Sequence, residues 1–382
     1  MGPTGLGALA VAVVVLIVLM IVTFVFWARM RGPSGVVWPI RAVMLLSCQL
    51  GAVLLAALLL NRSYDFYTSW GELFGQHPTV ESRSAQIGSL DARYWPLLLQ
   101  NYHLNRGTVL DTSIPGVHSH VGTKPAQIYL PPQYGDPAYA HRTFPVVELF
   151  SGFPGSPRSW THALHLASVL DQQIAAGASA PFIAVLPTIN VAYPRDTECV
   201  NVVAGPQVDT YLTTDVRAAV DTLVRADRFG HGWTAMGYST GGYCATNLAM
   251  RHPDLFSAAV SLGGYNAAPQ DLTTGSLFHG NRDLADQNDT VWRATNVDNV
   301  NLQLLLINSK QDTAAYQSGL ALARAARPPL QVWTLTLPRG GHNALVWDAE
   351  LPAAFAWLSH FVSSPVTPIP TLDGQLPQLV TE

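Results

Sequence analysis

The chain has 382 residues, of which 48% are hydrophobic and only 12% are charged, and its formal net charge is -4. Soluble proteins carry roughly 25% charged residues, and part of the deficit here is concentrated at the N-terminus. No cluster of Lys or Arg occurs outside that region, which excludes nucleic acid as a partner because phosphate binding needs a basic patch. The length suits one large domain and something smaller.

Two apolar runs near the N-terminus predict transmembrane helices. The first, Leu6 to Trp27, contains no charge and at about 1.5 Å per residue spans a hydrocarbon core of roughly 30 Å. A cleaved signal peptide is the alternative, but the run is too long, no positive region precedes it and no small-residue cleavage site follows. The second run, Val43 to Leu60, is shorter, and a buried or re-entrant helix is its alternative. We predict a two-span anchor over residues 1–61.

The loop between these runs carries Arg29, Arg31 and Arg41. Cytoplasmic loops are enriched in Arg and Lys, so this loop is predicted to lie in the cytoplasm. The N-terminus and everything after Leu60 then face outward. The sequence therefore predicts a multi-pass protein of the cell membrane whose main domain lies on the extracytoplasmic side.

The rest of the chain divides into a connector (residues 62–104) without clear period, a domain (105–365) and a tail (366–382). In the domain, short apolar runs alternate with helical stretches, which is typical of a mainly parallel sheet flanked by helices. The predicted strands are Thr108–Ile114, Ala126–Tyr129, Val146–Phe150, Phe182–Leu186, Trp233–Met236, Ala258–Leu262, Leu302–Ile307 and Gln331–Leu335. The predicted helices are Ser159–Ala175, Asp209–Ala226, Gly241–Arg251, Thr313–Ala326 and Ala349–Phe361. The polar stretch 265–300 is a candidate substrate-contacting insertion.

A nucleophile motif follows the fifth predicted strand. Gly237, Ser239 and Gly241 form a G-x-S-x-G pattern between an apolar strand and a helix. Glycines two residues either side of the serine allow strand and helix to pack closely around a sharp turn, which is the nucleophile elbow of α/β-hydrolases. The turn aims the hydroxyl at a helix N-terminus, which favours an oxyanion. A glycine-rich turn without catalytic role is the alternative, and the strand-turn-helix context argues against it.

A base and an acid follow the elbow in the chain order that this fold requires. His342 lies in a glycine-rich loop after the last predicted strand, where it can take the proton of Ser239. Asp312 follows the preceding strand and is the favoured acid, with Asp286 and Asp289 as rivals in the insertion. The alternative role of Asp312 is to cap the helix that begins at Thr313.

The oxyanion hole is predicted from the main chain. In this fold one donor lies in the loop after an early strand and the other is the residue after the nucleophile. These are the backbone N–H groups of Phe153 and Thr240. Changing their side chains should therefore matter less than losing Ser239.

With these residues assembled, the domain resembles the putative esterase family that includes esterase D-type enzymes and the antigen 85 mycolyltransferases. The resemblance runs from about Ala126 to Leu358 and rests on IYLPPQY, FPVVELFSGFPG, TYLTTDV, GYSTGGYCATNLAMRHPDLFSAAVSLGG and GGHNALVWDAELPAAFAWL. It implies acyl-ester chemistry through an acyl-Ser239 intermediate, with water or a carbohydrate hydroxyl as acceptor. It also places Asp196–Asn201 where relatives have substrate-lining or disulfide-bearing loops.

Three cysteines are present, and Cys48 lies in the second apolar run. Cys199 and Cys244 remain as a candidate disulfide in an oxidising compartment, the alternative being two buried thiols. No cofactor is required, and no metal either, because the histidines at 118–120 and 162–165 lack the accompanying ligands of a zinc site.

The sequence therefore predicts a membrane-anchored serine esterase with an acyl-ester or lipid substrate. Transfer of the acyl group to a sugar or lipid alcohol is the alternative, because it uses the same three residues. A non-catalytic envelope scaffold is the third interpretation.

Overall fold

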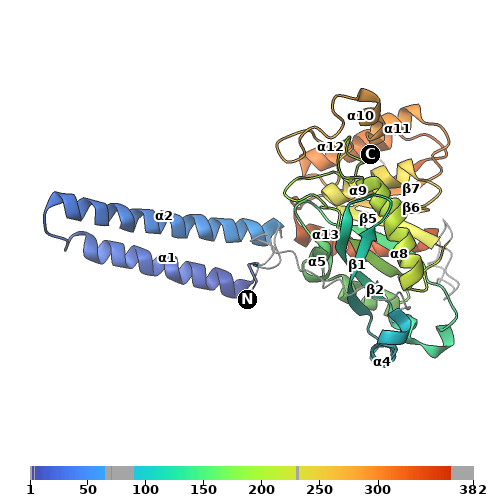
Figure 1. Cartoon of the computed structure of the whole chain (residues 1–382), viewed down its shortest axis with the longest axis horizontal. Coiled ribbons are helices and arrows are strands. Elements are labelled where there is room, and N and C mark those ends of the chain that lie inside the picture. The colour runs from blue at the N-terminus through green and yellow to red at the C-terminus, as the bar shows by residue number, and fades with distance from the viewer. Residues whose placement is uncertain (1, 4, 65–69, 71–89, 229–231, 363–382) are drawn as a thin grey trace. The chain divides into compact units, whose positions relative to one another are not determined.

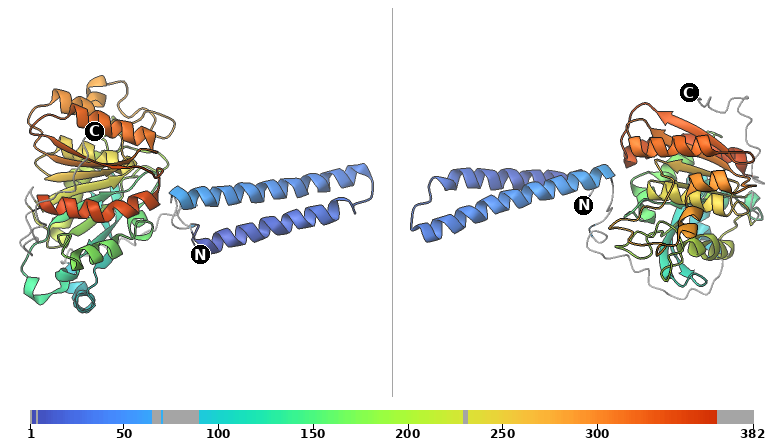
Figure 2. Two further views of the ribbon diagram at one scale, coloured as in Figure 1. Left: turned by 180° about the vertical axis from the view of Figure 1, so that it is seen from behind. Right: turned by 90° about the horizontal axis from the view of Figure 1, so that it is seen from above.

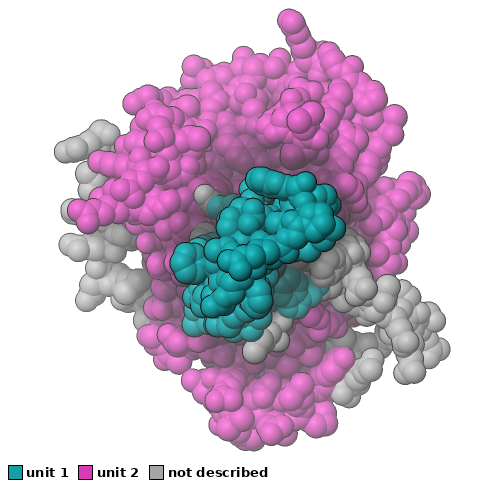
Figure 3. Space-filling view, turned by 90° about the vertical axis from the view of Figure 1, so that its left-hand side faces the viewer, with its two compact units in different colours: residues 1–78 teal, residues 79–382 magenta. Residues whose placement is uncertain are grey.

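The computed structural model describes residues 2–3, 5–64, 70, 90–228 and 232–362. The chain forms two compact units, residues 1–78 and residues 79–382, which Figure 3 colours separately. The predicted tail (366–382) and most of the predicted connector lie outside the described residues. The described end of the connector is a helix, α4 (Leu90–His103), although the sequence showed no clear period there.

The first unit contains two long helices that run side by side, α1 (Leu6–Trp27) and α2 (Ser34–Tyr64) (Figures 1 and 2). Arg41 joins them by donating a hydrogen bond of 3.0 Å to the carbonyl oxygen of Trp27. Both helices are long and apolar enough to cross a membrane, and only 6% of each apolar window is buried inside the protein. Length and composition alone do not separate such helices from a signal sequence. The second helix is longer than the predicted span 43–60.

The second unit is built on an eight-stranded sheet in the order β1-β2-β4-β3-β5-β6-β7-β8. The first two strands pair antiparallel, β2 pairs antiparallel with β4, and all pairs from β4 to β8 are parallel. The strands are β1 (Thr108–Gly116), β2 (Gly122–Leu130), β3 (Val146–Phe150), β4 (Ile183–Pro187), β5 (Trp233–Tyr238), β6 (Ala258–Leu262), β7 (Gln303–Ser309) and β8 (Gln331–Leu337). All eight predicted strands are present, with ends shifted by at most a few residues.

Helices cover both faces of this sheet because its central strands are apolar on both sides. In β3, Val146 and Phe150 belong to one apolar cluster while Val147 and Leu149 belong to the other. The first cluster is shared with α8 (Val216–Leu223), α9 (Thr240–Arg251), α11 (Thr290–Asn296) and α12 (Thr313–Ala325). The second is shared with α5 (Pro157–His162), α6 (Leu166–Ala175) and α13 (Ala344–Leu358), so the sheet lies between two helical layers (Figure 2).

Three predicted helices differ from the structure. The stretch Ser159–Ala175 is two helices, α5 and α6, because His165 adopts a left-handed conformation (φ 45°) that interrupts the hydrogen-bond ladder. The stretch Asp209–Ala226 contains α7 (Val208–Thr210), a π-helical turn over Tyr211–Asp215 and then α8. The last helix begins at Ala344 rather than Ala349, because Asn343 caps it by accepting a hydrogen bond from the N–H of Val346. The polar insertion also contains two short helices, α10 (Arg282–Gln287) and α11.

A buried carboxylate ties the β1–β2 hairpin to the π-helical turn. Asp215 is 3% exposed and accepts hydrogen bonds from the backbone N–H groups of His118 (2.9 Å) and Ser119 (3.0 Å) and from the Ser119 hydroxyl (2.5 Å). Burial alone would raise the pKa of Asp215, but these hydrogen bonds outweigh it and hold the pKa below its ordinary value. The hairpin turn is therefore fixed by a charged group.

Replacing Asp215 by Ala is expected to lower the free energy of unfolding by about 2–4 kcal/mol, because hydrogen bonds to a charged group are lost and two N–H groups become unpaired. The folded-state pKa is depressed, so this contribution is present above the ordinary pKa of an aspartate and is lost as the pH falls through the folded value. Denaturant unfolding at pH 7 and in acid measures both effects. Asp221→Ala, on the same helical segment, is the control and should cost much less.

Candidate active site

The turn between β5 and α9 holds Ser239 in a half-buried, strained position. Its backbone has φ 56° and ψ −124°, a region that residues with side chains rarely adopt. A Cβ at Gly237 would lie 2.0 Å from the carbonyl oxygen of Gly241, and a Cβ at Gly241 would lie 2.0 Å from that of Phe150. Both glycines are therefore required by close backbone packing, as the sequence predicted for a nucleophile elbow.

The loops after β7 and β8 bring two further side chains to this serine. His342 Nε2 lies 2.8 Å from Ser239 Oγ, and His342 Nδ1 lies 2.6 Å from Asp312 Oδ2. A carboxylate only accepts hydrogen bonds, so Nδ1 carries the proton and Nε2 is free to accept from the serine hydroxyl. The three side chains form one hydrogen-bonded chain from the acid to the nucleophile.

Among the described residues, the carboxylate that contacts His342 is that of Asp312 and of neither Asp286 nor Asp289. Asp312 also accepts a hydrogen bond from the backbone N–H of Ala315 (3.5 Å), so it caps α12 with one oxygen and holds His342 with the other. Asp289 instead caps α11 by accepting from the N–H groups of Val291 and Trp292. Asp286 lies within α10.

Two aromatic rings pack beside the imidazole of His342. Trp347 meets His342 edge-on with 4.9 Å between ring centroids, and Tyr238 stacks on Trp347 at 4.7 Å. Gly263, at the end of β6, passes so close that a Cβ there would lie 3.0 Å from the Trp347 indole nitrogen. Rotation of the His342 ring is thereby restricted, which favours the geometry in which Nε2 points at Ser239.

The predicted oxyanion donors flank the serine. Thr240 is the first residue of α9, and the loop after β3 approaches from the other side, since a Cβ at Gly152 would lie 3.2 Å from the Cβ of Ser239. In the described part of the chain, no protein group accepts a hydrogen bond from the N–H of Phe153 or of Thr240. We therefore expect both N–H groups to be available to a ligand.

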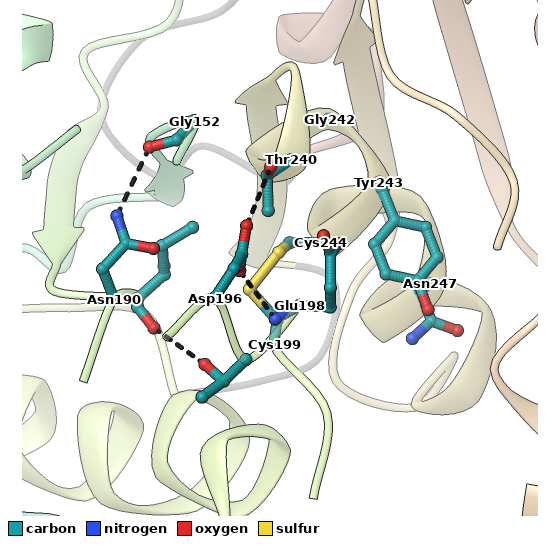
Figure 4. The surroundings of a disulfide bond; sticks show 12 residues. Gly152, Asn190, Asp196, Glu198, Cys199, Thr240, Gly242, Tyr243, Cys244 and Asn247 are labelled. Atoms are coloured by element: carbon teal, nitrogen blue, oxygen red, sulfur yellow. Dashed lines mark hydrogen bonds between the residues drawn. A yellow bond between two sulfur atoms is a disulfide. The ribbon is translucent and has the colours of Figure 1, made fainter. Parts of the chain in front are cut away.

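The sequence did not reveal Asn190, which supports this loop. Its side-chain amide donates to the carbonyl oxygens of Gly155 (2.6 Å) and, more weakly, of Gly152 (3.4 Å) (Figure 4). Because Asn190 follows β4 by a few residues, it bridges two neighbouring loops at the same edge of the sheet. No sequence motif marked it, since a lone Asn in a loop is common.

A second feature that the sequence did not reveal is a buried acidic network under Thr240. Asp196 and Glu198 are 3% and 2% exposed. Burial raises the pKa of Asp196 to about 6, although hydrogen bonds from Glu198 and Thr240 oppose this rise. Burial, the neighbouring charge of Asp196 and a hydrogen bond with it raise the pKa of Glu198 to about 9. The segment Asp196–Asn201 was interpreted from the sequence as a structural or substrate-lining loop, and the burial of these side chains favours the structural interpretation.

A disulfide joins this loop to the helix that follows the nucleophile. The Sγ atoms of Cys199 and Cys244 are bonded, and Cys244 lies five residues after Ser239 in α9 (Figure 4). Cys48 is the free cysteine among the described residues. The segment that carries the acidic network is therefore fastened covalently beside the elbow.

Two further histidines, His118 and His252, pair with carboxylates other than that of Asp312. His118 pairs with Asp215, and His252 pairs with Asp209 at 2.8 Å. Within the described residues, no group of three or more His, Cys, Asp or Glu side chains is arranged to hold a metal ion.

The fold and the Ser–His–Asp arrangement define a protein of the α/β-hydrolase class. The chain belongs to the Putative esterase family, whose model matches residues 122–358. The family resemblance seen in the sequence is thereby confirmed.

Three solved structures illustrate the shared fold. A ferulic acid esterase is 17% identical with a TM-score of 0.58, covering 68% of this chain and 99% of the esterase. An S-formylglutathione hydrolase from Agrobacterium tumefaciens is 15% identical with a TM-score of 0.57, covering 67% and 96%. A fluorophosphonate-binding serine hydrolase from Staphylococcus aureus is 17% identical with a TM-score of 0.55, covering 66% and 99%.

A curated relative is an uncharacterised protein of Corynebacterium glutamicum, 24% identical over 250 residues. The match covers 61% of this chain and 56% of that protein, so the chain spans little more than half the length of this relative.

Replacing Cys199 by Ser is expected to lower the free energy of unfolding by roughly 4 kcal/mol, because the bond closes a loop of 45 residues in the unfolded chain. Denaturant unfolding under non-reducing conditions measures the change, and Cys48→Ser is the control that should leave it unaltered. Alkylation of the denatured, unreduced protein at both Cys199 and Cys244 would show instead that the thiols are free.

Proposed function

We propose that the chain is a membrane-anchored serine esterase that cleaves carboxylic esters through an acyl-Ser239 intermediate. The observation that carries this proposal is the continuous hydrogen-bonded chain from Asp312 through His342 to Ser239. Family membership supports the reaction type, and several structural neighbours are named as esterases or hydrolases.

The first half of the reaction acylates the serine. His342 Nε2 takes the proton of Ser239 as Oγ attacks the ester carbonyl carbon, and the carbonyl oxygen becomes an oxyanion. The backbone N–H groups of Phe153 and Thr240, with the N-terminal end of α9, stabilise that negative charge. The tetrahedral intermediate then collapses, His342 gives its proton to the departing alcohol oxygen, and the acyl group stays on Ser239.

The second half repeats these steps with a hydroxyl acceptor. His342 removes a proton from the acceptor, whose oxygen attacks the acyl carbon, and returns that proton to Ser239 Oγ as the product leaves, a carboxylic acid with water and an ester with an alcohol. The carboxylate of Asp312 keeps the imidazole in the required tautomer and stabilises the imidazolium formed in both halves. With water as acceptor the result is hydrolysis.

Acyl transfer to a carbohydrate or lipid alcohol is the alternative outcome of the same intermediate. The two long apolar helices favour transfer to a lipid alcohol, because a membrane concentrates lipid esters and lipid alcohols near an anchored site. Partition of a labelled acyl group between water and an added alcohol decides which acceptor is used, since only the second half-reaction differs.

Fluorophosphonate labelling of the full-length protein in detergent tests the proposal. Wild-type protein should be labelled at Ser239, and Ser239→Ala should abolish both labelling and ester hydrolysis. Folded wild-type protein that neither reacts with the probe nor hydrolyses esters would favour the scaffold interpretation.

Removing the acid identifies the third member of the triad. Asp312→Asn should lower kcat/KM by about 10⁴-fold, because the imidazole loses the partner that fixes its tautomer. Asp286→Asn and Asp289→Asn are matched controls and should change kcat/KM by less than about tenfold, since their carboxylates do not contact His342. A comparable loss in either control would show that the acid has been assigned wrongly.

We further propose that both helices cross the membrane with residues 28–33 in the cytoplasm and the esterase domain outside. Arg29, Arg31 and Arg41 lie in and beside that loop, and cytoplasmic loops of membrane proteins are enriched in positive charge. Engineered cysteines test it: His360→Cys should react with an impermeant maleimide on intact cells, whereas Ser34→Cys should react only after permeabilisation. The reverse labelling pattern would show that the esterase domain lies on the cytoplasmic side.

A further inference from the structure

The buried acidic network under Thr240 consists of two carboxyl groups with no cation to balance them. Glu198 donates its backbone N–H to Asp196 Oδ1 (2.9 Å), and the neighbouring charge of Asp196 raises the pKa of Glu198. Among the described residues, no Arg, Lys or His contributes to stabilising the charge of either one, and Asp271 adds further negative potential. The neighbouring Arg195 directs its guanidinium to the carbonyl oxygens of Thr274 and Ser276.

Two neighbouring carboxylates in a buried site without a cationic partner oppose each other's ionisation, because each desolvated charge raises the energy of the other. A single proton shared between them leaves one negative charge and one internal hydrogen bond. Such a pair titrates as a unit, and its second ionisation is displaced to high pH.

The pair is linked directly to the proposed oxyanion hole. The Thr240 hydroxyl lies 3.5 Å from Asp196 Oδ2 and 3.1 Å from the Tyr265 hydroxyl, which itself lies 2.6 Å from Glu198 Oε2. The disulfide between Cys199 and Cys244 fastens the same loop to α9 (Figure 4). The residue whose N–H would bind the oxyanion is thus held by the pair through its own side chain.

We propose that Asp196 and Glu198 are positioning residues that share one proton, hold Thr240 for oxyanion binding, and switch the enzyme off when that proton is lost. This inference rests on the proposed function, because it requires the Thr240 N–H to stabilise an oxyanion. A second negative charge beneath Thr240, in a region shielded from water, opposes the charge that develops on the substrate oxygen. The effect acts on the transition state and therefore on kcat/KM, with little change in ground-state binding.

Other titratable groups face the pair, but they keep their charge state in the relevant range. Tyr265 and Tyr243 stack at 5.2 Å, and burial raises the pKa of each hydroxyl well above its ordinary value. The hydroxyl of Tyr243 donates to the carbonyl oxygen of Asn288. Asp271 accepts hydrogen bonds from Thr273 and Thr274, which lower its pKa. Arg251 lies on the far side of Tyr243 and pairs with Asp209.

The pH dependence of kcat/KM and of fluorophosphonate labelling tests the proposal in the full-length protein. Wild type should lose activity on the alkaline side around pH 9, where Glu198 ionises. Glu198→Gln replaces the protonated acid by a neutral group of similar shape, so it should keep at least a tenth of the wild-type activity at pH 7 and lose the alkaline decline. Asp196→Asn should also lose the decline, because neither variant can reach two negative charges.

Thermal unfolding provides a readout that does not depend on catalysis. The raised pKa of Glu198 means that the folded protein keeps a proton that the unfolded chain releases between about pH 4.5 and 9, so stability falls as pH rises through this window. Glu198→Gln removes that dependence, and its unfolding temperature relative to wild type should rise from pH 5 to pH 9. Glu350→Gln is the matched control, a half-buried glutamate on α13 outside the network, and should follow wild type in both assays.

Two results would overturn the proposal: an alkaline decline in Glu198→Gln that coincides with wild type, or an unfolding-temperature difference that does not change with pH. An inactive wild type would instead remove the proposed function, and the thermal comparison alone would then support or reject the shared proton.

Discussion

The close approach of backbone at the turn around Ser239 is the constraint on which the site depends. Gly237 and Gly241 have no room for a Cβ because β5, α9 and the end of β3 meet there. At this tightly packed turn Ser239 adopts a strained backbone conformation with φ 56° and ψ −124°. Every other functional group reaches the serine from loops at the same edge, because parallel strands bring their carboxyl ends together.

The residues around this turn come from elements of both helical layers. The layer with α9 and α12 carries Ser239 just before α9 and the helix capped by Asp312, while α13 in the other layer follows His342 and supplies Trp347. The hydrogen-bonded chain from Asp312 to Ser239 therefore joins loops that lead into both helical layers.

The loop 196–199 adds an unusual electrostatic element to this arrangement. Buried carboxyl groups without a cationic partner are costly unless they remain protonated, and their presence beside Thr240 indicates a role other than stability. A site that binds a developing oxyanion benefits from neutral hydrogen-bond donors around it. Keeping one proton on the pair meets that requirement near neutral pH.

Local sequence patterns were enough to locate the eight strands along the chain, the elbow, and Ser239 and His342 as candidates. These follow from short-range rules: apolar periodicity, glycine spacing, and position after a strand. It also identified Cys199 and Cys244 by counting, and Asp312 by its place after β7. Where two local roles competed for Asp312, the structure shows that it fulfils both, capping α12 and holding His342.

Interactions between residues distant in sequence became visible in the folded structure alone. It excluded Asp286 and Asp289 from contact with His342, interrupted the predicted helix at His165, and brought Asn190, Asp196, Glu198 and Tyr265 around the elbow. None of these has a local signature, because burial and charge neighbours arise only when the loops after separate strands pack together. Local sequence patterns thus identified the candidate residues of the site, and long-range packing determined which charged and buried groups surround them.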